Sequence, residues 1–155
     1  MPVIEVLTDI HAPAELCFDL ARDIDLHIES TAGTGERAVG GVLNGLISLG
    51  EEVTWEATHF GIRQRLTSRI TQFDRPRHFR DSQVRGAFRR FDHDHSFRVE
   101  SDTTLMRDVF DYESPLGLLG KLVDFCLLRS YMARLLRKRA LVIKAAAETS
   151  TLKRL

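Results

Sequence analysis

Residues 116–147 read LGLLGKLVDFCLLRSYMARLLRKRALVIKAAA, and no proline interrupts this stretch. Its first half is mostly apolar, whereas its second half is rich in arginine. The chain between about Gly33 and Tyr112 instead alternates apolar and polar residues, as β-strands do. A long sheet and one long helix both bury their apolar surfaces if the sheet curls around the helix, which leaves a pocket between them. The sequence therefore predicts an α+β fold with an internal cavity.

The predicted helix carries its apolar side chains along one stripe, at the spacing of an amphipathic helix. Phe125, Leu136 and Ile143 lie on this stripe, and Arg129 interrupts it with a charge. Additional leucines make the first half apolar over most of its circumference, which is typical of a helix that lines an apolar cavity. We therefore expect Phe125 and Arg129 to face a ligand. The basic second half is interpreted as a solvated end, with binding to a membrane surface or to a dimer partner as the alternative.

The chain of 155 residues is long enough to form one domain with its own core. We predict a single domain over residues 1–147 and a frayed tail over residues 148–155. Lys and Arg together number 22, as do Asp and Glu, so the net charge does not indicate binding to nucleic acid. Acidic residues concentrate in residues 1–60 and arginines in residues 61–98, which favours pairing between these segments within the fold.

The chain around Phe60-Gly61 predicts a β-hairpin, because this dipeptide suits a two-residue turn between two alternating segments. The resulting register places Glu56 opposite Arg65 on the solvent face, which is a favourable cross-strand pair. The same register directs Trp55 to the inner face. Pairing of this kind accounts for much of the arginine-rich block, so we predict no nucleic-acid partner.

The remaining elements are read from short periodic segments between turn signals. A strand at Val3–His11 ends before Pro13, and two short helices follow at Ala14–Arg22 and Asp23–Ser30. The hairpin strands span about residues 51–60 and 62–73. Further strands are expected at Arg37–Gly40, His78–Ala87, Arg90–Val99 and Thr104–Tyr112.

The segment FDHDHSF at residues 91–97 is the clearest local sign of a polar site. Strand alternation places its two histidines, His93 and His95, on the same inward face as its phenylalanines. The hairpin that follows sets His95 opposite Asp108, an acid on an otherwise apolar inward face. An inward carboxylate is costly without a partner, so a pair between His95 and Asp108 accounts for both residues.

Three interpretations of this pair remain open. It is a buried polar network that sets the strand register, an anchor for one polar group of a ligand in an apolar cavity, or a catalytic pair in which Asp108 orients His95 as a general base. His-x-His with a carboxylate can also bind a divalent metal, but no clear third ligand accompanies it, so we predict no metal site. Strand parity adds further side chains to the expected cavity wall: Trp55, His59, Gln83, His93, Phe110 and Tyr112.

Several classes of function lack their sequence signatures. No phosphate-binding glycine loop, dinucleotide fingerprint or nucleophile motif is present, so we expect no cofactor. Cys17 and Cys126 lack the spacing of a metal or redox site, which favours a reducing compartment. No secretion signal opens the chain, and the apolar run Leu116–Leu128 is interrupted by charges and too short to span a bilayer. We expect a soluble cytoplasmic protein without stable membrane insertion.

The predicted order of one strand, two short helices, six antiparallel strands and a long C-terminal helix resembles the helix-grip superfamily, often called SRPBCC. This superfamily includes START lipid-transfer domains, pollen-allergen-type proteins and polyketide cyclases. The resemblance covers residues 2–147, and the chain looks like the small bacterial members labelled cyclase/dehydrase or ligand-binding. Four stretches carry it: IEVLTDIHAPAE at 4–15, EVTWEATHFG at 52–61, FDHDHSF at 91–97 and PLGLLG at 115–120.

This resemblance implies a curved seven-stranded antiparallel sheet wrapped around the C-terminal helix. It also implies a hydrophobic cavity for a lipid, a polyketide, a quinone or a similar molecule. It does not imply catalysis, because many members only bind or carry ligands. We therefore predict binding or transport of a small hydrophobic ligand. The alternatives are a cyclase or dehydratase that uses His95 with Asp108 as general base, and a dimeric interaction module, such as a homodimer, without a ligand.

Overall fold

The computed structural model describes residues 2–115 and 117–154 of the chain. Seven antiparallel strands form one sheet in the order β1-β7-β6-β5-β4-β3-β2, so the first two strands of the chain lie at opposite edges. The strands are β1 (Val3–Ile10), β2 (Arg37–Gly41), β3 (Glu52–His59), β4 (Ile62–Asp74), β5 (His78–Arg85), β6 (Arg90–Glu100) and β7 (Thr103–Glu113).

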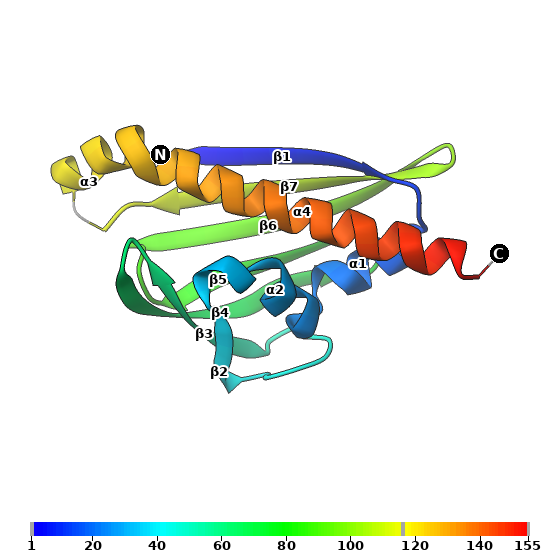
Figure 1. Cartoon of the computed structure of the whole chain (residues 1–155), viewed down its shortest axis with the longest axis horizontal. Helices are drawn as coiled ribbons and strands as arrows, with labels where there is room; N and C mark the ends of the chain where they lie inside the picture. The colour runs from blue at the N-terminus through cyan, green and yellow to red at the C-terminus, as the bar shows by residue number, and fades with distance from the viewer. Residues whose placement is uncertain (1, 116, 155) are drawn as a thin grey trace.

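Helices occupy the connection after β1 and the end of the chain. The short helices α1 (Ala14–Ala21) and α2 (Ile24–Ser30) and a 3-10 turn at Ala32–Thr34 separate β1 from β2. The chain closes with α3 (Gly117–Val123), a π-helical turn at Asp124–Leu128 and the long helix α4 (Arg129–Leu152). Figure 1 shows α4 crossing the face of the sheet, with α1 and α2 beside it. The predicted α+β helix-grip fold is confirmed.

Local sequence explains where the two short helices begin. Pro13 has an extended backbone immediately before α1, and its fixed φ and missing N–H end β1 without weakening the helix. Asp23 caps α2, because its side chain accepts hydrogen bonds from the backbone N–H groups of Asp25 and Leu26. Both helices contact α4 and lie on the side of the sheet that α4 also covers.

Both predicted hairpin registers are confirmed. Glu56 pairs with Arg65 across β3 and β4, and the turn residues Phe60 and Gly61 have φ values of 52° and 76°, as the expected two-residue turn requires. His95 and Asp108 are direct partners across β6 and β7. The same registers place His93 opposite Phe110, Phe91 opposite Tyr112 and Trp55 opposite Leu66.

The core is tightly packed at the end of the molecule where α1 lies. Phe18 of α1 is fully buried and makes edge-to-face contacts with Phe73, Phe79 and Phe97 of the sheet, at ring-centroid distances of 5.2, 5.2 and 5.5 Å. The later part of α4 completes this core with buried residues that include Ile143. The other end of the molecule is less filled, and the cavity lies there.

The C-terminal helical segment differs from the expected unbroken helix. The π-helical turn between α3 and α4 adds a residue to one turn, which rotates everything before it relative to α4. Phe125 consequently has an exposed fraction of 83%, and Arg129 is also exposed. At the other end, the segment expected as a frayed tail from Glu148 is helical as far as Leu152. Among the described residues, no helix is long and apolar enough to cross a membrane.

Candidate ligand cavity

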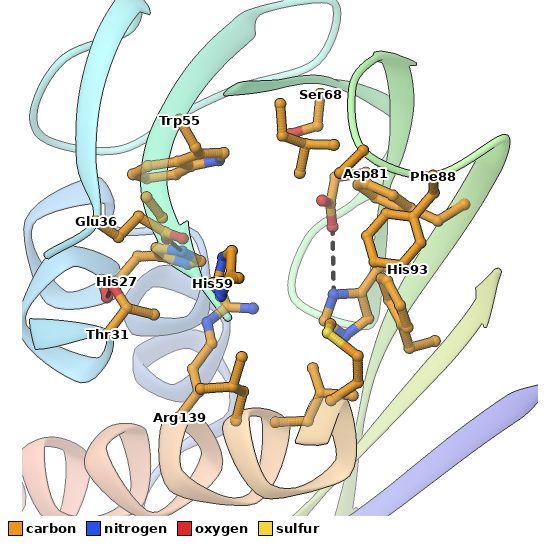
Figure 2. A pocket seen from close by; sticks show the side chains of 18 of the residues that line it. His27, Thr31, Glu36, Trp55, His59, Ser68, Asp81, Phe88, His93 and Arg139 are labelled. Carbon is orange, nitrogen blue, oxygen red and sulfur yellow. Dashed lines mark hydrogen bonds and ion pairs between the residues drawn. The ribbon is translucent and has the colours of Figure 1, made fainter. Parts of the chain in front are cut away.

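A cavity of about 540 Å³ lies between the sheet and the first half of α4. Residues of β3 to β6 supply much of its wall, and residues of α2 and α4 close it (Figure 2). The wall is mainly apolar, with side chains such as Trp55, Leu66, Phe91 and Leu136. Three further apolar lining residues are largely exposed: Phe60, Ile62 and Val123. The cavity therefore opens to solvent near the β3–β4 turn and α3.

One side of the cavity carries an Asp–His cluster, which consists of Asp81, His93, His95 and Asp108. Nδ1 of His95 donates to Oδ1 of Asp108 at 2.6 Å, and Nε2 of the same ring lies 3.2 Å from Oδ1 of Asp81. His93 lies between the same two carboxylates, with Nδ1 3.7 Å from Asp81 and Nε2 3.6 Å from Asp108. Three adjacent strands therefore bring two acids and two imidazoles into one group.

Burial and charge set the protonation states of this cluster. Burial by itself lowers the pKa of His95, but the hydrogen bond and the negative charge of Asp108 outweigh it and raise that pKa above its usual value. Burial, together with the positive charge of His95, lowers the pKa of His93. Burial opposes ionisation of Asp81 and Asp108, yet the two histidines hold the pKa of each carboxyl below its usual range. The carboxylates of Asp81 and Asp108 thus favour a proton on His95, whereas burial disfavours one on His93.

A second polar pair, His27 and Glu36, lies on the opposite side of the cavity (Figure 2). Nε2 of His27 is hydrogen-bonded to Oε1 of Glu36, and the His27 ring stacks on Trp55 at a centroid distance of 4.2 Å. Burial opposes ionisation of Glu36, but the bond to His27 lowers the pKa of its carboxyl below the usual value. Burial and the charge of Arg139 lower the pKa of His27. This side of the cavity therefore presents a carboxylate beside an aromatic surface.

The helix α4 adds polar groups of its own to the cavity. Arg139 reaches from α4 toward His59 and His27 (Figure 2) and donates to the backbone carbonyl of Ala21 at 2.6 Å. His59 and Tyr131 share a hydrogen bond of 2.7 Å between Nδ1 and the phenol oxygen. Burial lowers the pKa of His59 and raises that of Tyr131, so both groups are neutral at neutral pH. Arg139 thus places a cationic group on the same side of the cavity as Glu36.

Four of the residues predicted from strand parity line the cavity: Trp55, His59, His93 and Phe110. His95, Asp108 and Tyr112 do point inward, but they are buried behind the cavity wall and do not line it. Inward orientation and contact with the cavity are different properties, because a wall of packed side chains separates the deepest residues of the sheet from the open space.

Three other predicted residues lie elsewhere. Gln83 bonds through its side-chain amide to the backbone of Phe88, accepting from N–H and donating to C=O, so it shapes the β5–β6 turn. Phe125, within the π-helical turn, and Arg129, the first residue of α4, are exposed and absent from the cavity lining. The structure therefore corrects the expectation that these three side chains face a ligand.

The cavity also contains residues that sequence reasoning missed as site residues. Asp81 shares the parity of the inward Phe79, so strand alternation carried a signal for it. His27 and Glu36 belong to a short helix and a turn, where no regular alternation indicates which side chains face inward. Tyr131 and Arg139 belong to α4 and lie beside the apolar stripe from which the cavity-facing residues of this helix were predicted.

Comparison with known proteins shows similarity only at the level of structure. No protein-family model matches the chain, and no curated protein matches it. Among solved structures, TTHA0849 from Thermus thermophilus is 20% identical, with 94% of this chain and 99% of that chain covered and a TM-score of 0.73. Ginseng major latex-like protein 151 from Panax ginseng is 18% identical, with 94% and 97% covered and a TM-score of 0.69.

A START superfamily protein from Mycobacterium smegmatis is likewise similar. It is 14% identical, with 95% of this chain and 97% of that chain covered and a TM-score of 0.70. Matches that span nearly the whole of both chains at such low identity show a shared fold. The chain therefore has the helix-grip fold of START-like proteins, as the sequence resemblance implies.

Proposed function

We propose that this protein binds a small, largely apolar ligand in the cavity between the sheet and α4. The observation that carries the proposal is the cavity itself, whose volume of about 540 Å³ suits a small organic molecule. Ligand sites are typically mostly apolar spaces of roughly 300–1,000 Å³ that contain a few converging polar groups. The fold shared with START-like proteins supports the same proposal.

The arrangement of polar groups narrows the kind of ligand. Glu36 and Arg139 lie on one side of the cavity, and Asp81 and His93 lie on the other. Burial of a polar group without a partner is unfavourable, so a ligand that fills the space satisfies these groups with its own donors and acceptors. A lipid, polyketide or quinone with oxygen substituents at its ends fits this pattern. Trp55 and the other apolar lining side chains provide the contact area for its body.

The single tryptophan offers a direct test. Trp55 lines the cavity and is the only Trp in the chain, so its fluorescence reports occupation of this space. We expect titration with quinones and fatty acids to change the Trp55 emission saturably for the ligand class that binds. Native mass spectrometry of the freshly purified protein is expected to reveal a co-purified small molecule of the same class.

Two neighbouring positions on β3 provide matched variants. Ala57 is buried and lines the cavity, whereas Thr58 is exposed on the opposite face of the same strand. Ala57→Phe fills part of the space and is expected to weaken binding at least ~10-fold, because each lost ~1.4 kcal/mol of binding free energy is a factor of ten. Thr58→Phe is expected to bind normally. Equal affinities for the two variants would place the ligand elsewhere and overturn the proposal.

The enzymatic alternative needs different residues from those predicted. His95 is 1% exposed, both of its ring nitrogens face carboxylates, and it does not line the cavity. It therefore does not reach a ligand as a general base, whatever the role of Asp108. A cyclase or dehydratase of this fold would use Asp81 or His93, which line the cavity. Binding without catalysis accounts for the cavity with fewer assumptions, and we favour it.

A further inference from the structure

Asp81, His93 and His95 bring three metal-ligating side chains together at the cavity wall. Asp81 comes from β5 and the two histidines from β6, and one ligand atom of each lies within 4.8 Å of those of the others. We propose that these residues form a binding site for a divalent transition-metal ion such as Zn²⁺, with Asp108 orienting the histidines. The proposal concerns a second ligand class and does not depend on the apolar ligand.

The spacing of the donor atoms fits metal coordination. Oδ1 of Asp81 lies 3.2 Å from Nε2 of His95 and 3.7 Å from Nδ1 of His93. Tetrahedral Zn²⁺ with bonds of 2.0–2.1 Å places its ligand atoms about 3.4 Å apart. These two distances lie on either side of this value, and all three ligand atoms lie within 4.8 Å of one another. The set of two histidines and one carboxylate is a common one for zinc and for non-haem iron.

Asp108 sets the ring orientation that a metal requires. The Nδ1–H of His95 donates to Asp108, which leaves Nε2 of the same ring directed at Asp81. Nε2 of His93 also faces Asp108, at 3.6 Å, which leaves Nδ1 of that ring directed at Asp81. Metal-ligating histidines usually bond through their second nitrogen to such a carboxylate, which fixes the tautomer and the ring. One buried carboxylate thus stands behind both histidines.

His93 is held only weakly by the two carboxylates around it. Its side chain is buried, and among the described residues no group lies within hydrogen-bonding distance of its Nε2. Buried polar atoms without partners are uncommon, because burial without a hydrogen bond is unfavourable. A metal ion bound at Nδ1 polarises the ring and strengthens the attraction between the Nε2–H and Asp108. The ion therefore accounts for a side chain that is otherwise poorly satisfied.

Charge balance favours a divalent cation. Asp81 and Asp108 place two carboxylates around the two histidine rings, within 3.7 Å of their nitrogens. The two positive charges of a divalent ion balance these two carboxylates when both histidines bind as neutral imidazoles. Imidazole ligands favour Zn²⁺ and similar ions over Mg²⁺ and Ca²⁺, which prefer oxygen ligands.

The cavity side of the cluster leaves room for a further ligand. Asp81 and His93 line the cavity, whereas His95 lies behind them. Three protein ligands leave a fourth position of a tetrahedral ion for water or for an oxygen atom of a bound molecule. The class of molecule that suits this position carries a carbonyl, enolate or phenolate oxygen on a largely apolar body.

The test uses the full, untagged chain after dialysis against a chelator. Isothermal titration is expected to show one equivalent of Zn²⁺ bound and no saturable binding of Mg²⁺. Co²⁺ is expected to give the visible absorption of a four-coordinate nitrogen and oxygen site. Asp81→Asn removes the anionic ligand with little change in shape and is expected to lower the Zn²⁺ affinity at least ~100-fold, since loss of even an outer partner commonly costs 10–100-fold.

Two further variants serve as a control and as a substitute for Asp81→Asn. His78→Gln removes a histidine that bonds to Asp94 away from the cavity, and it is expected to leave Zn²⁺ binding unchanged. His93→Gln serves if Asp81→Asn does not fold, because Nε2 of His93 has no hydrogen bond to lose. Absence of a stoichiometric Zn²⁺ site in the wild-type protein would overturn the proposal. So would wild-type affinity in Asp81→Asn, or loss of binding in His78→Gln.

Discussion

Asp108 illustrates how one buried residue organises its surroundings. Its side chain is 7% exposed, bonds to His95 and lies 3.6 Å from His93. A buried charge of this kind adds little net stability while it is paired, yet it leaves its partners uncompensated when it is removed. We therefore expect the cluster to help specify the sheet register, since a shift of one residue would separate Asp108 from His95.

Replacement of Asp108 tests this role. Asp108→Ala leaves the buried ring of His95 without its shortest hydrogen bond, so we expect the free energy of unfolding to fall by about 3–5 kcal/mol. Chemical denaturation monitored by circular dichroism measures this change. The matched control is Asp111→Ala, because Asp111 lies on the same strand but pairs with Arg90 on the exposed face. It is expected to cost at most about 1 kcal/mol.

Similar losses for the two variants would contradict this view of Asp108. They would indicate that the His95–Asp108 pair is no more sensitive than a surface ion pair, and that packing alone maintains the β6–β7 register.

At the scale of elements, one face of β3 lines the cavity and the other forms ion pairs with the neighbouring strands. Trp55 and Ala57 face the cavity, whereas Glu56 lies on the other face between arginines of the neighbouring strands. Arg37 of β2 donates to Glu56 at 2.6 Å, and Arg65 of β4 donates to it at 2.8 Å. Because β2 is an edge strand, this shared carboxylate helps to hold it against the sheet beside the cavity.

These arginines predict a pH dependence of stability. Their hydrogen bonds lower the pKa of Glu56 from 4.5 to about 2. A lowered folded-state pKa means that Glu56 stabilises the fold fully above pH 4.5 and loses this contribution as the pH falls toward 2. We expect the stability difference between the wild type and Glu56→Gln to be constant above pH 5 and to shrink between about pH 4.5 and 2. A difference that persists unchanged at pH 2 would contradict this prediction.

At the scale of the whole molecule, α4 extends from the end that contains the cavity to the tightly packed end near α1. Its first half contributes Leu135, Leu136 and Arg139 to the cavity wall. Its second half buries Ile143 and Ala147 in the core beside α1 and β1. One helix thus both stabilises the fold and leaves space for a ligand, since the sheet touches it closely at only one end. Figure 1 shows this helix extending past α1 at its C-terminal end.

Two truncations along α4 distinguish these roles. Ile143 is 2% exposed and does not line the cavity, so Ile143→Ala is expected to lower the free energy of unfolding by about 2–5 kcal/mol. Leu135 is half-buried and lines the cavity, so Leu135→Ala is expected to cost only about 1 kcal/mol, because little close packing is lost. Thermal or chemical denaturation measures both values. The reverse order would show that the cavity end carries the stability of the fold.

The elements and their pairing follow from local patterns in the chain. Alternation along residues 91–97 directs His93 and His95 inward, and complementary charges set Glu56 against Arg65. A strand has only two faces, so parity decides orientation without knowledge of the rest of the molecule. Apolar residues at helical spacing likewise predicted the long C-terminal helix, and the order of the elements predicted the helix-grip fold.

Which inward side chains reach the cavity depends on contacts between distant elements. His27, Glu36 and Arg139 meet there only because α2 and α4 dock on the same side of the sheet. Conversely, His95 points inward yet lies behind the wall, and the π-helical turn takes Phe125 away from it. A residue pattern reports the face of an element, whereas the depth of a side chain and the rotation of a helix are set by packing against other elements. The fold could therefore be inferred from the chain alone, but the composition of its cavity could not.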